Sequence, residues 1–91
     1  MVTSSAERRS CRRQRATEVF AKQAEAALDA LALLDFAWHD CYGDPCPSDD
    51  VIEDVWVLGD GELSEYISAA HLAVIDCRDL RMYAGEARRR T

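Results

Sequence analysis

Several signatures that would assign a function are missing from this sequence. It has no run of 18 or more apolar residues, which excludes a transmembrane helix. The first fifteen residues, MVTSSAERRSCRRQR, are charged but are not followed by an apolar run, so we predict no secretory signal and a cytoplasmic location. There is no phosphate-binding glycine loop, no G-x-S-x-G and no H-E-x-x-H. We therefore predict that the protein is not an enzyme and uses no cofactor.

Basic residues are absent from the whole middle of the chain. Residues 1–22 hold six basic and two acidic side chains, residues 23–77 hold thirteen acidic and no basic ones, and residues 78–91 hold five basic and two acidic ones. These blocks carry +4, −13 and +3, which gives the net charge of −6. An acidic surface of this size exceeds what solubility needs and favours a partner of opposite charge.

Glycine and proline are absent before Gly43, and the spacing of apolar residues indicates one long helix there. A first apolar stripe recurs at intervals of four and three residues: Phe20, Ala24, Ala27, Leu31, Leu34, Trp38 and Cys41. A second apolar stripe runs beside it: Val19, Ala26, Ala30, Leu33 and Ala37. A helix that is apolar on several sides must be covered on several sides, within the domain or in an oligomer. The pattern fails upstream of Thr17, so a basic N-terminal arm is predicted there, which either continues the helix or frays.

Two further helices are predicted after the break at residues 43–47. Ser48 is a good N-cap, and a short amphipathic helix follows it and stops at Gly59. Its β-branched residues also permit a strand, but no partner strand is visible. Asp60 can cap a last helix that runs to about Tyr83. The apolar stripe of this last helix is Leu63, Tyr66, Ile67, Ala70, Val74, Cys77 and Leu80.

The predicted fold is therefore all-α, with three helices in the order long–short–long and charged ends. The predicted divisions are a basic N-terminal arm at residues 1–16, a helical domain at residues 17–84 and a basic C-terminal tail at residues 85–91. A chain of 91 residues forms one small domain, which buries only about 60–65% of its unfolded surface. Because such a core is thin, we predict a homo-oligomer.

Five side chains are candidate metal ligands: His39, Cys41, Cys46, His71 and Cys77. Structural zinc needs four ligands, usually with pairs at a tight spacing such as C-x2-C, and no such pair occurs. His71 and Cys77 stand six residues apart on one helix and would point about 120° away from each other. We predict no bound metal. A disulfide between Cys41 and Cys46 is an alternative that their spacing leaves open.

The stretch WHDCYG, residues 38–43, contains two of these five candidate ligands. We interpret it as the C-terminus of a helix. Cys41 falls on the first apolar stripe, where a reduced cysteine behaves as a small hydrophobic residue. His39 lies in the last turn, where a cation meets the helix dipole favourably, and Asp35 precedes it by four residues. Gly43 then ends the helix.

The leading hypothesis is a non-catalytic protein–protein interaction or regulatory module that binds a protein with a basic surface. Aromatic side chains are frequent anchors of interfaces, and acidic side chains steer association. The predicted contacts are Asp49, Asp50, Glu53, Asp54, Trp56 and Tyr66. One alternative is a nucleic-acid-associated protein whose arm binds phosphates through Arg8, Arg9, Arg12, Arg13 and Arg15. Another is an acidic mimic of nucleic acid that inhibits a nucleic-acid-binding protein.

Two segments, WHDCYG and DDVIEDVWVLGDGELSEYISAAHLAVIDCRDLR, resemble small helical proteins of actinomycetes and their mobile elements. The resemblance covers residues 28–82. It implies an all-helical fold and an actinobacterial source, and the ratio of ten arginines to one lysine is typical of a GC-rich genome. It implies no catalytic or binding residue.

Overall fold

The computed structural model describes residues 4–90, and every regular element among them is helical. The elements are α1 (Ser5–Phe20), a short 3-10 helix η1 (Ala21–Gln23), α2 (Ala24–Tyr42), α3 (Asp49–Gly59), α4 (Leu63–Ile75) and α5 (Cys77–Arg89). The predicted all-α fold is confirmed. The predicted three-helix arrangement is wrong, because each of the two long helices is divided.

The first division lies at Ala21, which joins α1 to η1. Ala21 has a φ of 49°, in the left-handed region that residues other than glycine seldom adopt. The chain reverses at this point, α1 packs against α2, and the side chain of Phe20 becomes buried. Burial of that ring contributes about 1.5–3 kcal/mol, which offsets a backbone strain of about 1–3 kcal/mol.

The packed structure extends beyond the predicted domain boundaries at residues 17 and 84. Ser4 is the N-cap of α1 and accepts a hydrogen bond from the N–H of Glu7 at 3.1 Å. Residues 5–16, which were predicted to form an arm outside the domain, thus form most of α1. At the other end, residues 85–89 complete α5, where a tail was predicted. Residues 1–3 and 91 of the predicted arm and tail lie outside the described residues.

The second division lies at Asp76, between α4 and α5. The backbone of Asp76 is extended, and its side chain accepts hydrogen bonds from the N–H groups of Arg78 (3.0 Å) and Asp79 (3.2 Å). Asp76 is therefore the N-cap of a new helix. The single last helix expected from the sequence is wrong, because this cap starts α5 in a new direction.

The predicted boundaries of α2 and α3 agree with the structure at three positions. Gly43 adopts a left-handed φ of 82° and donates its N–H to the carbonyl of His39 at 2.8 Å, so WHDCYG is the end of a helix. Ser48 is the N-cap residue of α3, which ends at Gly59. Asp60, predicted to cap the next helix, instead closes α3 in a left-handed conformation with a φ of 46°.

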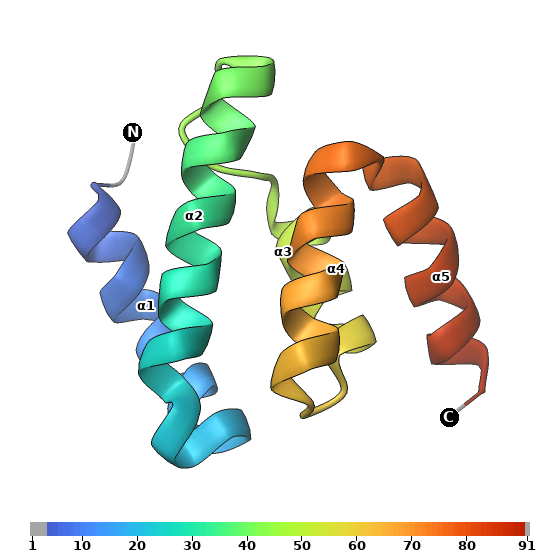
Figure 1. Cartoon of the computed structure of the whole chain (residues 1–91), viewed down its shortest axis with the longest axis horizontal. Coiled ribbons are helices and arrows are strands. Elements are labelled where there is room, and N and C mark those ends of the chain that lie inside the picture. Colours follow the sequence, from blue (N-terminus) through green and yellow to red (C-terminus); the bar gives the residue numbers. More distant parts are fainter. Residues whose placement is uncertain (1–3, 91) are drawn as a thin grey trace.

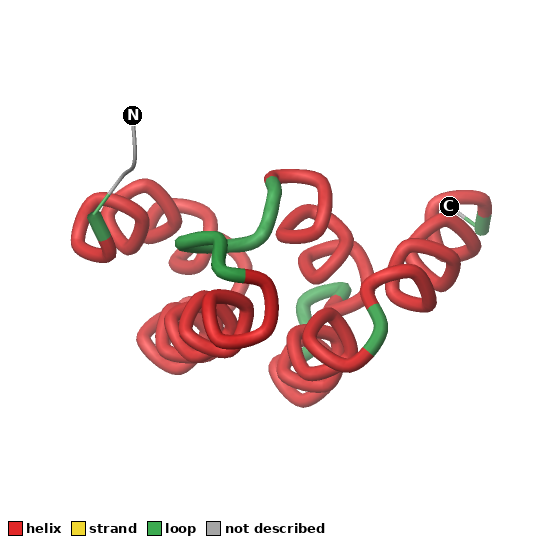
Figure 2. The backbone as a smooth tube through the Cα atoms, turned by 90° about the horizontal axis from the view of Figure 1, so that it is seen from above, coloured by secondary structure: helices red, strands yellow, loops and turns green. Residues whose placement is uncertain are grey.

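The five α-helices form two layers (Figure 2). One layer contains α1, α3 and α5, and the other contains α2 and α4, which lie in contact and run in the same direction (Figure 1). The chain alternates between the layers, so successive helices point in opposite directions. The molecule measures 35 × 31 × 21 Å, and its shortest dimension equals about two helix diameters. Each layer therefore has one face on the core and one outer face.

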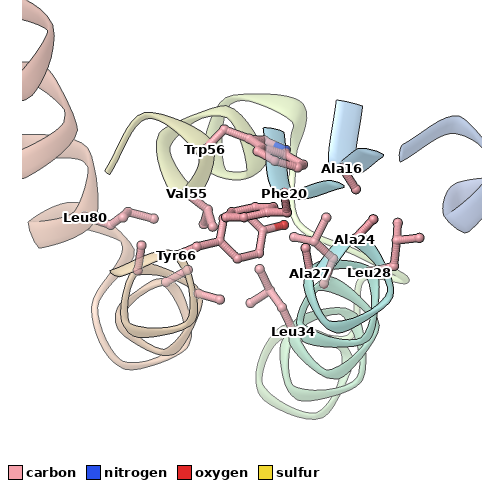
Figure 3. Packing of buried hydrophobic residues seen from close by; sticks show 14 residues of the cluster. Ala16, Phe20, Ala24, Ala27, Leu28, Leu34, Val55, Trp56, Tyr66 and Leu80 are labelled. Carbon is pink, nitrogen blue, oxygen red and sulfur yellow. The ribbon is translucent and has the colours of Figure 1, made fainter. Parts of the chain in front are cut away.

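The core lies between the layers and is centred on three aromatic rings (Figure 3). Phe20, Trp56 and Tyr66 contact one another with ring centroids 4.9–5.9 Å apart. The first apolar stripe is buried from Phe20 to Trp38, as predicted, whereas Cys41 is exposed, because α2 extends past the helices that cover it. Within residues 4–90, no helix is both long and apolar enough to cross a membrane.

Candidate functional site

The two aromatic residues predicted as partner contacts are part of the core. Trp56 is 7% exposed and Tyr66 is fully buried, so neither presents a surface for a partner. Both side chains are buried because Phe20, the last residue of α1 before the reversal at Ala21, packs against both rings. Burial raises the pKa of the Tyr66 hydroxyl.

The four acidic residues predicted as contacts differ in their surroundings. Asp54 is 1% exposed and forms ion pairs with Arg81 (3.4 Å) and Arg88 (2.9 Å), so its assignment to the surface is wrong. These pairs attach α5 to α3. Asp49, Asp50 and Glu53 are exposed, as a partner-binding role requires.

Two of the five arginines predicted to bind nucleic acid hold the buried carboxylate of Asp35. Arg8 donates one hydrogen bond to it at 3.2 Å, and Arg12 donates two, at 2.9 and 3.1 Å. The Asp35 side chain is only 9% exposed, and those of Arg8 and Arg12 are 14% exposed. A charge buried this deeply needs its partners, so this ion-pair cluster fixes α1 on α2.

Two further arginines bind acidic residues near the start of α2. Arg9 donates to Glu25 at 2.7 Å and to Asp29 at 2.9 Å, and Arg13 donates to Glu25. The hydrogen bonds from Arg13 and then Arg9 lower the pKa of Glu25, and those from Glu25 and Asp29 raise the pKa of Arg9. Because both acids are largely exposed, these pairs contribute little to stability.

The fifth arginine, Arg15, connects α1 to α3. It donates two hydrogen bonds to Glu53, at 2.5 and 2.8 Å, and its guanidinium lies 4.7 Å from the centroid of the Trp56 ring. The hydrogen bonds from Arg15 lower the pKa of Glu53. This position satisfies the charge of Arg15 and also covers one face of the buried tryptophan.

The acidic middle of the chain and its two basic ends thus partly neutralise each other. Five of the thirteen acids in residues 23–77 pair with arginines of the two basic ends: Glu25, Asp29, Asp35, Glu53 and Asp54. A phosphate that approached the five arginines of α1 would have to displace carboxylates from all of them. The geometry therefore does not favour the predicted nucleic-acid contact.

The candidate metal ligands do not converge. Among residues 4–90 there is no group of three or more His, Cys, Asp or Glu side chains that could hold a metal ion. Cys41 and Cys46 are both free thiols, so the structure contains no disulfide between them, and Cys77 is also a free thiol.

Two hollows lie along α2, one on each side. The first, of about 560 Å³, lies between the N-terminal half of α1 and α2. Its lining includes Arg8, Arg12 and Asp35, together with His39 and the exposed Phe36. Because Asp35 already binds both arginines, a ligand would have to compete with this carboxylate for them.

The second hollow is an apolar groove of about 420 Å³ between α2 and α4, on the side of these helices away from the core; we call it the α2/α4 groove. Its lining consists of Ala26, Asp29, Ala30, Leu33, Leu34, Ala37, Ile67, Ala70, His71 and Val74. The only carboxylate in this set belongs to Asp29, which Arg9 already binds. Leu33 is 69% exposed and Ile67 is 48% exposed. Exposed apolar surface of this kind is typical of an interaction site.

One side of this groove could be predicted from the sequence. Four of the five residues of the second apolar stripe line it: Ala26, Ala30, Leu33 and Ala37. The α4 side could not be identified in advance, because it depends on which helix lies beside α2.

No family model, curated protein or solved structure matches this chain. The predicted resemblance to actinomycete proteins therefore stays a prediction, and the proposals below rest on the geometry of the chain itself.

Proposed function

We propose that this protein is a non-catalytic interaction module that binds a helical protein segment in the α2/α4 groove. One observation supports the proposal above all: Leu33 and Ile67 are exposed to water beside a groove lined by small apolar residues. Solvent exposure of such side chains is unfavourable until a partner covers them.

The shape of the groove suits a helix better than an extended peptide. Two helices in contact leave a furrow parallel to their axes, and ridges of a third helix pack into such a furrow. Ala26, Ala30 and Ala37 present only methyl groups, so a partner backbone can approach closely. The hydrogen bonds of a helix are internal, which agrees with a groove that offers few polar groups.

Burial of the exposed side chains in the groove would supply part of the energy of binding. Full burial of a leucine or isoleucine side chain contributes about 1.5–3 kcal/mol. Leu33 and Ile67 are partly covered already, so together they would contribute about 2–4 kcal/mol. Asp49 and Asp50 are exposed but do not line the groove, so in this proposal they steer association without making the central contact.

Site-specific photo-crosslinking in the cells that produce the protein tests the proposal. A photoreactive amino acid replaces Leu33 in one variant and Phe36 in a matched control. Phe36 is also exposed on α2 but lines the other hollow. We expect a discrete cross-linked protein from position 33 and none from position 36. The absence of a product at position 33, or equal products at both positions, contradicts the proposal.

A further inference from the structure

We infer that the segment bound in the α2/α4 groove belongs to a second copy of this chain, so that two copies associate about a two-fold axis through their α2/α4 layers. The inference rests on the proposed function and names its partner. Two properties of the surface support it: its shape and its charge.

The shape is self-complementary. Leu33 is the central residue of α2, since nine residues precede it and nine follow it in Ala24–Tyr42. Its exposed side chain projects from α2, whereas the short side chains of Ala30 and Ala37 on the same helix leave recesses beside it. A two-fold axis close to Leu33 places the α2 helices of the two copies antiparallel, so that each leucine enters the furrow of the other copy. An isologous contact requires this combination of a projection and a recess on one face.

The charge of the groove favours a neutral apolar partner over a basic one. Its only carboxylate, that of Asp29, lies 2.9 Å from a nitrogen of Arg9. A basic partner would find no unpaired acid among the lining residues, whereas a second copy would bring the same largely apolar surface. The net charge of −6 on each chain is carried elsewhere, so it opposes association only over a longer range.

Light scattering coupled to gel filtration measures the mass directly over concentrations from about 1 µM to about 1 mM. The variants are Leu33→Gln and Ile67→Gln, with Phe36→Gln as the matched control. Glutamine is a good helix former and leaves the net charge unchanged, and all three positions are exposed, so each variant should fold. Circular dichroism checks this directly. We expect twice the mass of 10.2 kDa for the wild type and for Phe36→Gln.

The groove variants should weaken the dimer by at least about 30-fold, because each substitution occurs twice at a two-fold interface. Added salt should strengthen the wild-type dimer by screening two chains of like charge, whereas it would weaken binding to a basic protein. A wild-type monomer at all concentrations overturns the inference, and so do open-ended larger assemblies or a dimer that Leu33→Gln leaves intact. If position 33 cross-links a different protein and the wild type is a monomer, the proposed function stands and the second-copy inference fails.

Discussion

Replacement of Asp35 by asparagine should destabilise the protein strongly, because Asp35 is the buried anion that holds α1. Asparagine has nearly the same shape, so the change removes the charge and leaves the packing largely intact. Arg8 and Arg12, each 14% exposed, would then lose their shared carboxylate. Removing one partner from a buried ion pair costs about 3–5 kcal/mol. Since some water reaches this cluster, we expect about 3 kcal/mol.

This loss is a large fraction of the total stability. A chain of 91 residues has a free energy of unfolding of about 5–14 kcal/mol. A loss of about 3 kcal/mol lowers the melting temperature by roughly 12–24 °C for a domain of this size. Urea unfolding followed by circular dichroism and tryptophan fluorescence measures the change, and the midpoint should fall while the slope stays constant.

Two comparisons decide whether the reasoning is correct. Asp29→Asn removes an exposed acid that also pairs with an arginine, and it should lose less than about 1 kcal/mol. The combined variant Arg8→Met, Arg12→Met and Asp35→Leu replaces the whole cluster by apolar side chains and should be nearly as stable as the wild type. If Asp35→Asn is no more destabilising than Asp29→Asn, the cluster does not hold α1 and the argument is refuted.

Three further changes test the packing. Gly59→Ala would place a Cβ 2.9 Å from the Cβ and 3.1 Å from the Cα of Tyr66, so it should cost about 1–3 kcal/mol in urea unfolding. Gly85→Ala is the control, because the atom nearest to its new Cβ belongs to a flexible side chain 3.7 Å away, and it should not destabilise the protein. Asp76→Ala should cost about 1 kcal/mol through loss of the α5 cap, and an unchanged urea midpoint would show that the cap is dispensable. Because burial raises the pKa of Tyr66 above 10.0, the folded chain keeps a proton that the unfolded chain releases. Its contribution to stability is therefore complete below about pH 10 and is lost as the pH rises further. Tyr66→Phe should reduce this alkaline loss in melting curves at stepped pH, and an identical loss in both proteins would contradict it.

The N-terminal segment shows how sequence reasoning failed at one point and misjudged several residues as a result. The helical periodicity of residues 20–38 is correct, and the stripe that it defines is buried. Nothing at Ala21 indicates a reversal, because the residue there is a strong helix former and no glycine or proline is nearby. Without that reversal, α1 is expected to be an arm, its arginines are expected to be available for phosphates, and Trp56 is expected to lack the cover that Phe20 provides.

The division at Asp76 was different, since a local signal was present. An aspartate followed three residues later by a second acid, Asp79, resembles a helix N-terminus. The apolar stripe that runs across this position favours one continuous helix and competes with this cap signal. The predicted boundary is wrong here because two local signals compete, whereas at Ala21 no local signal is present.

Sequence patterns were enough to predict the all-α fold, the end of α2 at Gly43, the bounds of α3 and most of the buried stripe of α2. These features depend on helical periodicity and on caps, which act within a few residues. Which charges pair and which apolar faces are exposed to water depends instead on how the helices pack. Arg8 and Arg12 bind Asp35 across 27 and 23 residues, and Arg15 binds Glu53 across 38. The α2/α4 groove likewise joins residues far apart in the sequence, such as Leu33 and Ile67, which are separated by 34 positions. Contacts over such separations depend on the direction that the chain takes at its turns, and at Ala21 the energy of the packed core, not the local sequence, set that direction.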